Sequence, residues 1–202
     1  LLASLIWGTA FVAQFIGMAA VGPFTFTATR FLLGSLVITP LAWREYHLLR
    51  KSGVTPTLTD LLCWSGLGVV LCLGVNLQQI ALLSTTVSNA GFLTALYVPL
   101  VPLLNRLLYR ERIHPAIWAA VTGCLLGTFL LSGGRLAALT EGDYWVLAST
   151  VFWTFHVVWV GRMAERMFQA LDTNRDGRVT FEEIWAQTQA RFTAADANHD
   201  GY

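Results

Sequence analysis

Charged residues are scarce in this chain. Thirteen Lys or Arg and twelve Asp or Glu make up only 12% of the 202 residues. Soluble domains carry about 25% charged residues, because a globule in water needs a hydrated surface. Hydrophobic residues make up 55% of the sequence, and the mean hydropathy is +0.57. This composition excludes an ordinary water-soluble globule and predicts a protein whose partner is the lipid bilayer.

Motifs of enzymes, redox proteins and nucleic-acid-binding proteins are also missing. The three cysteines, Cys63, Cys72 and Cys124, lie in apolar segments without a C-x-x-C spacing, so we interpret them as small buried side chains. The sequence contains no zinc motif, phosphate-binding loop or nucleophile–base set. It also has no basic patch of the kind that binds nucleic acid. We therefore expect neither an enzyme nor a nucleic-acid-binding protein.

Long apolar segments fill most of the chain up to Arg162. A helix needs about 20 mostly apolar residues to cross about 30 Å of hydrocarbon at a rise of about 1.5 Å per residue. Turn-forming residues such as Gly22-Pro23 and Gly133-Gly134 separate the segments. Six segments qualify as spans: Leu1–Ala20, Phe24–Trp43, Leu58–Leu77, Asn89–Leu108, Pro115–Ser132 and Tyr144–Arg162. The predicted fold is an all-α, polytopic transmembrane helix bundle.

Basic residues occur in alternate loops between these segments. The basic positions that follow the second, fourth and sixth segments are Arg44, Arg50, Lys51, Arg110, Arg112, Arg162 and Arg166, whereas the loop after the fifth segment has one Arg, Arg135, against Glu141 and Asp143. Lys and Arg in short loops mark the cytoplasmic side of a membrane. We therefore predict a multi-pass protein of the inner (plasma) membrane with its N-terminus and its C-terminal tail in the cytoplasm.

The first and sixth segments share a sequence pattern. Trp7–Val12 reads W-G-T-A-F-V and Trp153–Val158 reads W-T-F-H-V-V. The alternating loop charges predict that the two segments cross in opposite directions, which is how an inverted repeat begins. We therefore divide the chain into a first five-helix repeat (1–140), the first helix of a truncated second repeat (141–163) and a polar tail (164–202).

Five stretches of the membrane part resemble EamA-type members of the drug/metabolite transporter superfamily. These stretches are Leu5–Val12, Ala28–Leu33, Leu77–Thr94, Tyr97–Leu104 and Arg110–Arg112. The resemblance implies ten helices in two inverted five-helix repeats, and a substrate such as an amino acid, a sugar, a nucleotide derivative or a drug. The chain departs from this plan after its sixth segment.

Three polar residues within the spans are candidate contacts for a small-molecule substrate. Arg30 in the second segment is costly at bilayer depth, at roughly 2.5–3.5 kcal/mol, so it either snorkels to the outer headgroups or faces an anionic group of the substrate in a cavity. Gln14 and Asn76 either bond between helices or contact the substrate. Pro99 and Pro102 should bend the fourth segment, as they remove backbone donors.

The polar tail contains a complete EF-hand loop from Asp172 to Glu183. Ca²⁺ takes six to eight oxygen ligands in such loops, and a glycine at position 6 allows the sharp turn, which is Gly177 here. The predicted ligands at positions 1, 3, 5, 7, 9 and 12 are Asp172, Asn174, Asp176, Arg178 (through its carbonyl), Thr180 and Glu183. Arg175 and Arg178 oppose the carboxylates, so we expect modest calcium affinity.

A second, incomplete loop follows at residues 196–202. Asp196, Asn198 and Asp200 occupy its positions 1, 3 and 5, and the closing Glu is missing, so we expect poor binding by this loop alone. Because no Pro, Gly or Ser linker separates Arg162 from Asp172, the sixth membrane helix can continue into the helix that enters the first loop.

The sequence thus supports two functions of different classes. The first is a transporter-like protein for small metabolites or drugs with a calcium-binding tail. The alternative is a membrane-anchored calcium-binding or sensor protein without transport, or a truncated or chimeric fragment. The sequence leaves a homodimer open.

Overall fold

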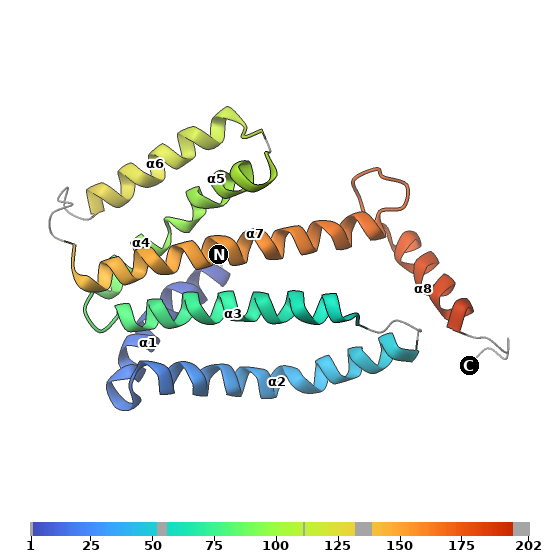
Figure 1. The fold of residues 1–202 in the computed structure, drawn as a ribbon, viewed down its shortest axis with the longest axis horizontal. Coiled ribbons are helices and arrows are strands. Elements are labelled where there is room, and N and C mark those ends of the chain that lie inside the picture. Colours follow the sequence, from blue (N-terminus) through green and yellow to red (C-terminus); the bar gives the residue numbers. More distant parts are fainter. Residues whose placement is uncertain (1, 52–55, 111, 132–138, 196–202) are drawn as a thin grey trace. The chain divides into compact units, whose positions relative to one another are not determined.

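The structure is a computed structural model that describes residues 2–51, 56–110, 112–131 and 139–195 (Figure 1). Within these ranges every regular element is a helix, which confirms the predicted all-α class. The helices are α1 (Leu2–Val21), α2 (Pro23–Lys51), α3 (Leu58–Ala81), α4 (Val87–Thr94), α5 (Tyr97–Tyr109), α6 (Pro115–Leu131), α7 (Glu141–Leu171) and α8 (Phe181–Ala195). The incomplete loop with Asp196, Asn198 and Asp200 lies outside the described residues.

The chain divides into two compact units, which we describe separately. The first unit comprises Leu1–Phe31 and Gly66–Trp159, and it contains α1, the start of α2, most of α3, all of α4, α5 and α6, and the first part of α7. The second unit comprises Leu32–Ser65 and Val160–Tyr202, and it contains the EF-hand loop and α8.

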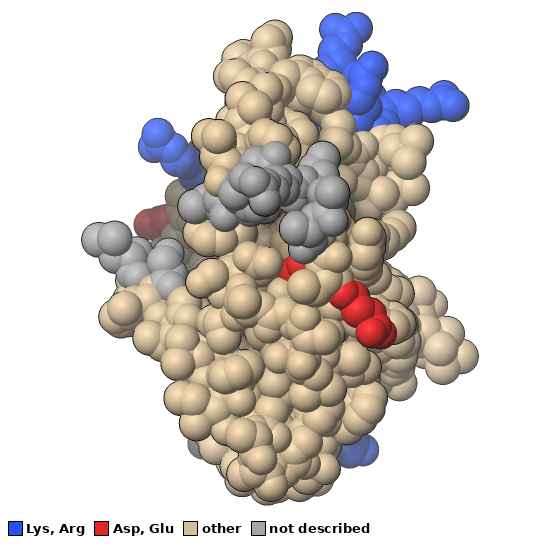
Figure 2. Space-filling model, turned by 90° about the vertical axis from the view of Figure 1, so that its left-hand side faces the viewer, with Lys and Arg blue, Asp and Glu red and all other residues tan. Residues whose placement is uncertain are grey.

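Within the residues that the structure describes, four helical stretches are long and apolar enough to cross a membrane. They are Pro23–His47, Leu58–Ala81, Val87–Tyr109 and Glu141–Leu171. The apolar stretches at the predicted first and fifth spans are shorter, at Leu5–Val21 and Pro115–Gly127. Six crossings therefore remain a prediction. Figure 2 shows one face of the molecule, on which uncharged residues predominate.

Gly22 makes the turn between α1 and α2. Its φ of +75° lies in the left-handed region that glycine adopts without strain, and its N–H donates to the carbonyl of Met18 at 3.0 Å. Pro23 then opens α2, where a missing N–H costs no helical hydrogen bond. Beyond the turn, the ring of Phe26 lies where a side chain on Gly17 would be, so the two helices approach closely.

The predicted fourth span is two helices, α4 and α5. The sequence predicted a bend here, and two turn residues, Ala95 and Leu96, interrupt the helix while keeping right-handed helical dihedral angles. Pro99 has no N–H for the carbonyl of Ala95, and the N–H of Val98 donates to that carbonyl at 3.0 Å. Pro102 removes a second donor within α5. Broken helices at bilayer depth are common beside transporter binding sites.

The core of the first unit lies where α1, α3, α4 and α7 meet. Its buried members are Met18, Ala81, Leu82, Ala90, Leu93 and Val146. Small residues let helices approach closely in membrane proteins, where packing replaces the hydrophobic effect. Phe152 of α7 packs against Gly74 of α3 in this way, and Trp159 of α7 packs against Gly66 of α3.

The start of α7 lies close to the backbone of the turn after α3. A Cβ atom on Gly142 would lie 2.5 Å from the carbonyl oxygen of Ala81 and 2.7 Å from the nitrogen of Thr85. Asp143 is fully buried there, and it accepts hydrogen bonds from the Thr85 hydroxyl and from the N–H of Thr140 (2.8 Å). Asp143 and Thr140 form a reciprocal cap for α7, because the N–H of Asp143 donates to the Thr140 hydroxyl at 3.2 Å.

Candidate functional site

A cavity of about 360 Å³ in the first unit contains two of the three predicted substrate contacts, Gln14 and Arg30. Four helices supply its wall, with Gln14 on α1, Arg30 on α2, Gln78 on α3 and Trp153 on α7. Small-molecule sites typically have volumes of about 300–1,000 Å³ and combine apolar walls with a few polar groups. The cavity matches both criteria.

Arg30 meets only aromatic rings among the described residues. Its guanidinium carbon lies 5.2 Å from the ring centre of Phe31 and 5.9 Å from that of Phe26. Such cation–π contacts stabilise a cation by about 0.5–2 kcal/mol but leave its N–H donors without an acceptor. Within the described part of the chain, no carboxylate or other hydrogen-bond acceptor pairs with it. Arg30 therefore brings an uncompensated positive charge to the cavity wall.

Gln14 also has unused hydrogen-bonding capacity at this wall. Only 7% of its surface is exposed, and its side-chain amide makes no hydrogen bond to any residue that the structure describes. A buried amide without a partner costs roughly 1–3 kcal/mol. Both amide atoms nevertheless keep some accessible surface, so they are not sealed inside the protein. The amide thus reaches the cavity and can bond to a guest.

Aromatic side chains that sequence reasoning did not select complete the wall. Trp7 and Trp153 pack edge to face with their ring centres 5.6 Å apart, and His156 lies beside Trp153 at 6.2 Å. The indole nitrogen of Trp153 and Nδ1 of His156 are buried without a hydrogen-bond partner in the described chain. The matching sequence patterns that begin at Trp7 and Trp153 could have identified these two aromatic residues. Gln78 donates to the Thr94 hydroxyl at 2.8 Å, which is a structural role.

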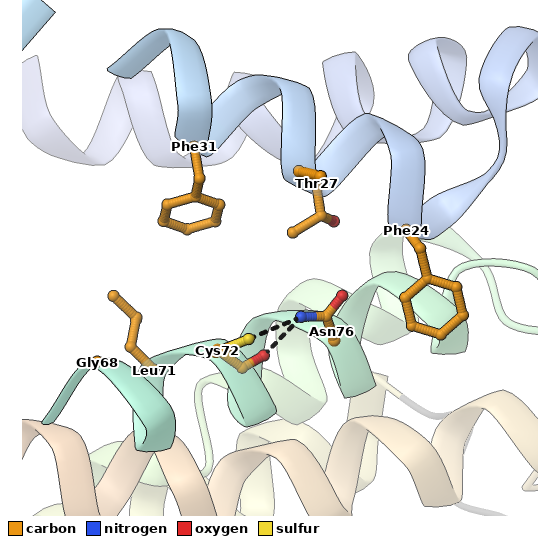
Figure 3. A pocket seen from close by; sticks show the side chains of 8 residues that line it. Phe24, Thr27, Phe31, Gly68, Leu71, Cys72 and Asn76 are labelled. Atoms are coloured by element: carbon orange, nitrogen blue, oxygen red, sulfur yellow. Dashed lines mark hydrogen bonds between the residues drawn. The ribbon is translucent and has the colours of Figure 1, made fainter. Parts of the chain in front are cut away.

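The structure places Asn76 at a different cavity from Gln14 and Arg30. This second cavity, of about 540 Å³, lies between α2 and α3, and Figure 3 shows Thr27 and Phe31 on one side and Leu71 and Asn76 on the other. The Asn76 amide donates to the carbonyl (2.8 Å) and the sulfur (3.3 Å) of Cys72, one turn earlier in α3. Its nitrogen is therefore occupied within its own helix. Phe31 and Leu71 line both cavities.

The EF-hand loop of the second unit is organised by its own carboxylates. Asp172, 7% exposed, accepts from the N–H groups of Asp176 (3.2 Å) and Gly177 (3.0 Å). Gly177 has a φ of +78°, as position 6 of such a loop requires. Arg175 also has a positive φ, +59°, which is strained for a residue with a side chain.

Glu183 closes the loop by bonding to its backbone. One carboxylate oxygen accepts from the N–H groups of Thr173 (3.0 Å) and Asn174 (3.2 Å), and the other accepts from that of Thr180 (3.0 Å). The donors at Thr180 and Asn174 lower the pKa of Glu183 to about 2. The N–H of Glu183 in turn donates to the Thr180 hydroxyl (3.3 Å), which caps α8.

The donor set of this loop suits Ca²⁺, although its geometry needs adjustment for binding. Among the described residues, no three His, Cys, Asp or Glu side chains are placed to hold an ion by themselves. An ion here would also need oxygens from Asn174, Thr180 and the Arg178 carbonyl, which are hard ligands of the kind that Ca²⁺ prefers. The Thr180 hydroxyl and one Glu183 oxygen now serve the helix cap, and the other Glu183 oxygen accepts from the backbone of Thr173 and Asn174, so an ion would have to displace these hydrogen bonds.

Comparison with known proteins identifies the family of the membrane part of the chain. The EamA-like transporter family matches residues 1–133, which is more than half of the chain. The chain belongs to this family. An uncharacterized transporter from Archaeoglobus fulgidus is 29% identical over 153 residues, covering 75% of the chain and 44% of that protein. The chain therefore spans less than half the length of this relative. No solved structure matches the chain.

The EamA match includes α1 to α6 and therefore Gln14, Arg30 and Asn76. Trp153 and His156, which complete the first cavity, lie beyond residue 133. A separate EF-hand family matches residues 163–186, which include all six predicted calcium ligands of the complete loop. The chain is thus an EamA-family, multi-pass membrane protein with an EF-hand segment near its C-terminus.

Proposed function

We propose that this EamA-family chain carries small metabolites or drugs across the inner (plasma) membrane, and that it is a carrier rather than an enzyme. The observation that carries the proposal is the cavity between α1, α2, α3 and α7, with the unpaired polar groups of Gln14 and Arg30 at its wall. Polar groups without partners at bilayer depth are expensive, and a substrate that pairs with them offsets the cost. Asn76 is proposed as a contact at the neighbouring cavity.

The proposed topology is six crossings with both ends in the cytoplasm. The alternation of basic loops supports it. The two helices with related sequences, α1 and α7, would then be the first helices of two inverted repeats. Whether the working unit is a homodimer is decided by its mass in detergent.

We also propose that the loop from Asp172 to Glu183 binds Ca²⁺. Asp172, Asn174, Asp176, Thr180, Glu183 and the carbonyl of Arg178 would hold the ion. Bound Ca²⁺ supplies two positive charges that offset most of the charge on its three carboxylate ligands, Asp172, Asp176 and Glu183. The turn at Gly177, which the Asp172 carboxylate holds through the N–H groups of Asp176 and Gly177, supports this assignment.

Transport is tested with the purified chain in lipid vesicles. The vesicles are loaded with a defined mixture of amino acids, sugars, nucleosides and aromatic acids, and mass spectrometry follows the loss of each compound. We expect loss of at least one compound, and a much slower loss for Arg30→Lys, because an ammonium cannot reproduce the planar fork of a guanidinium. Arg106→Lys is the matched control, since Arg106 is an exposed residue of α5 outside the cavity. Equal flux with and without protein refutes the proposal.

A second candidate function is a membrane-anchored calcium sensor without transport. The continuity of α7 favours it, because this helix runs unbroken from Glu141 to Leu171 and ends directly before the first loop ligand, Asp172. The vesicle experiment with and without calcium separates the two functions. Flux that disappears on deletion of α1 supports the carrier, whereas calcium binding without any flux supports the sensor.

A further inference from the structure

We infer that the Gln14–Arg30 cavity selects a small organic monoanion that carries a flat aromatic ring, of which an aromatic carboxylate is the simplest case. This inference rests on the proposed function, because it names the substrate class of the same cavity. Three properties of the wall carry it: its charge, the shape of its donors and its aromatic surface.

The charge of the wall favours a single negative charge on the guest. Arg30 is its one permanently charged residue within the described chain, and no Asp or Glu lines the cavity. A monoanion neutralises Arg30, whereas a dianion would retain a net charge in a medium of low dielectric constant. A cation would place two positive charges together without a counterion. The cavity should therefore reject amines and bind singly charged acids.

The polar groups of the wall match a carboxylate. A guanidinium offers two parallel N–H donors that fit the two oxygens of a carboxylate, and such charge-assisted pairs are shorter and stronger than neutral hydrogen bonds. Arg30 has no competing acceptor among the described residues, and its guanidinium carbon is 5.2 Å from the ring centre of Phe31. The amide of Gln14, 7% exposed and without a partner, can donate to the same anion.

The apolar part of the wall favours a ring over an alkyl chain. Trp7 and Trp153 meet edge to face at 5.6 Å and at an interplanar angle of 65°, and Phe11 lies at the same cavity. Aromatic groups that meet in offset or edge-to-face geometry gain about 0.5–1.5 kcal/mol beyond the burial of their surface. A volume of about 360 Å³ accommodates a one- or two-ring acid rather than a larger molecule.

The test compares four probes that differ in one property at a time. Benzoate has the ring and the charge, benzamide has the ring without charge, benzylamine has the ring with the opposite charge, and acetate has the charge without the ring. Binding is measured by equilibrium dialysis against the full-length chain, purified in detergent and freed of lipid. We expect benzoate to bind at least about tenfold more tightly than benzamide, since hydrogen bonds to a charged group are worth about 1.5–3 kcal/mol. Benzylamine and acetate should show no binding at the same concentrations.

Two variants assign the binding to the cavity. Arg30→Gln should weaken benzoate binding at least about tenfold and leave benzamide nearly unchanged. Arg106→Gln removes the same charge from an exposed position of α5 and should change neither. If Arg30→Gln does not fold, the comparison of the four probes on the unmodified chain still decides the inference, and Arg30→Lys replaces it as the variant.

Three results would overturn the inference. The first is equal binding of benzoate and benzamide, the second is unchanged benzoate binding by a folded Arg30→Gln variant, and the third is binding of acetate as tight as that of benzoate. A further control adds phosphatidylglycerol to the benzoate-binding assay. If this lipid displaces benzoate, Arg30 pairs with a lipid headgroup, and this result also overturns the inference.

The outcomes for substrate class and for transport are distinguishable. Benzoate binding in detergent without flux in vesicles would support the monoanion site and refute the transport function. Flux of a sugar or a nucleoside without benzoate binding keeps the carrier and removes the monoanion site.

Discussion

Trp7 of α1 and Trp153 of α7 are in edge-to-face contact, with their ring centres 5.6 Å apart. The two residues open the matching sequence patterns of these helices, and they meet at the cavity that contains Gln14 and Arg30. Corresponding positions of two inverted helices come together only near the axis that relates them. The contact is therefore the geometry that an inverted repeat would produce at its centre.

The contact between Trp7 and Trp153 should be measurable as a coupling energy. We expect Trp7→Ala and Trp153→Ala to be non-additive in unfolding free energy by about 0.5–1.5 kcal/mol, the usual strength of an aromatic pair. The measurement is a double-mutant cycle by denaturant titration in detergent. Trp118 of α6, 47% exposed, is the control partner, and its pairing with Trp7 should be additive. Additivity for Trp7 and Trp153 would contradict the contact.

Gly142→Ala should destabilise the first unit. The new methyl group would lie 2.5 Å from the carbonyl oxygen of Ala81 and 2.7 Å from the nitrogen of Thr85, and both belong to backbone that cannot simply rotate away. Overpacking of this kind costs about 1–3 kcal/mol. Thermal unfolding in detergent measures the effect. Gly161→Ala in the same helix has no atom within 4 Å of the new methyl and should stabilise slightly, by about 0.5–1 kcal/mol, so a similar loss in both variants would argue against the clash.

Glu183→Gln should abolish most calcium binding. The substitution removes one negative charge and one of the two oxygens that position 12 supplies, and we expect a fall in affinity of about 100-fold. Glu182→Gln is the matched control, because Glu182 has the same charge at the neighbouring position and is exposed. Isothermal titration calorimetry compares the two. Equal affinities would show that Glu183 is not a ligand.

Arg175→Gly should tighten calcium binding. Arg175 adopts a φ of +59°, which costs a residue with a Cβ atom roughly 1–2 kcal/mol, and its charge opposes the ion. Glycine removes both penalties, and we expect the dissociation constant to fall about fivefold, with part of the gain offset by the entropy of the unfolded loop. Arg175→Gln removes the charge and keeps the strain, so it should improve affinity less. An equal gain in both variants would mean that backbone strain contributes nothing.

Local features of this chain could be predicted from sequence because neighbouring residues determine them. Gly22-Pro23 marks the turn between α1 and α2, and the spacing from Asp172 to Glu183 places the left-handed Gly177 correctly. The sixth span was predicted to end at Arg162, with a helix that can continue into the EF-hand, and α7 does continue to Leu171. Apolar composition ends where the bilayer would end, whereas a helix continues until a residue interrupts its hydrogen bonding, as happens at Asp172 and the loop beyond it.

Features that depend on contacts between distant residues could not be predicted. Gly123 and Gly127 form a G-x-x-x-G pattern, which often marks close helix packing in membranes, but among the described residues no atom of a neighbouring element lies within 4 Å of a Cβ built on either. Among the described glycines, the tightest approach to another backbone is instead at Gly142, which belongs to no motif. The cavity likewise joins Trp7 to Trp153 and separates Asn76 from Gln14, because helix rotation determines which face each residue occupies.

The one-residue turn at Gly22 has a consequence for how the chain enters the membrane during synthesis. Because Pro23 follows at once and Phe26 packs over Gly17, the connection between α1 and α2 is too short for either helix to insert without the other. They should partition from the translocon as one helical hairpin. α1, which has no charged residue, would then enter the membrane together with α2, which must bring the guanidinium of Arg30 across the lipid headgroups. Lengthening that turn with a flexible spacer would uncouple the pair and leave the second helix prone to remain at the interface.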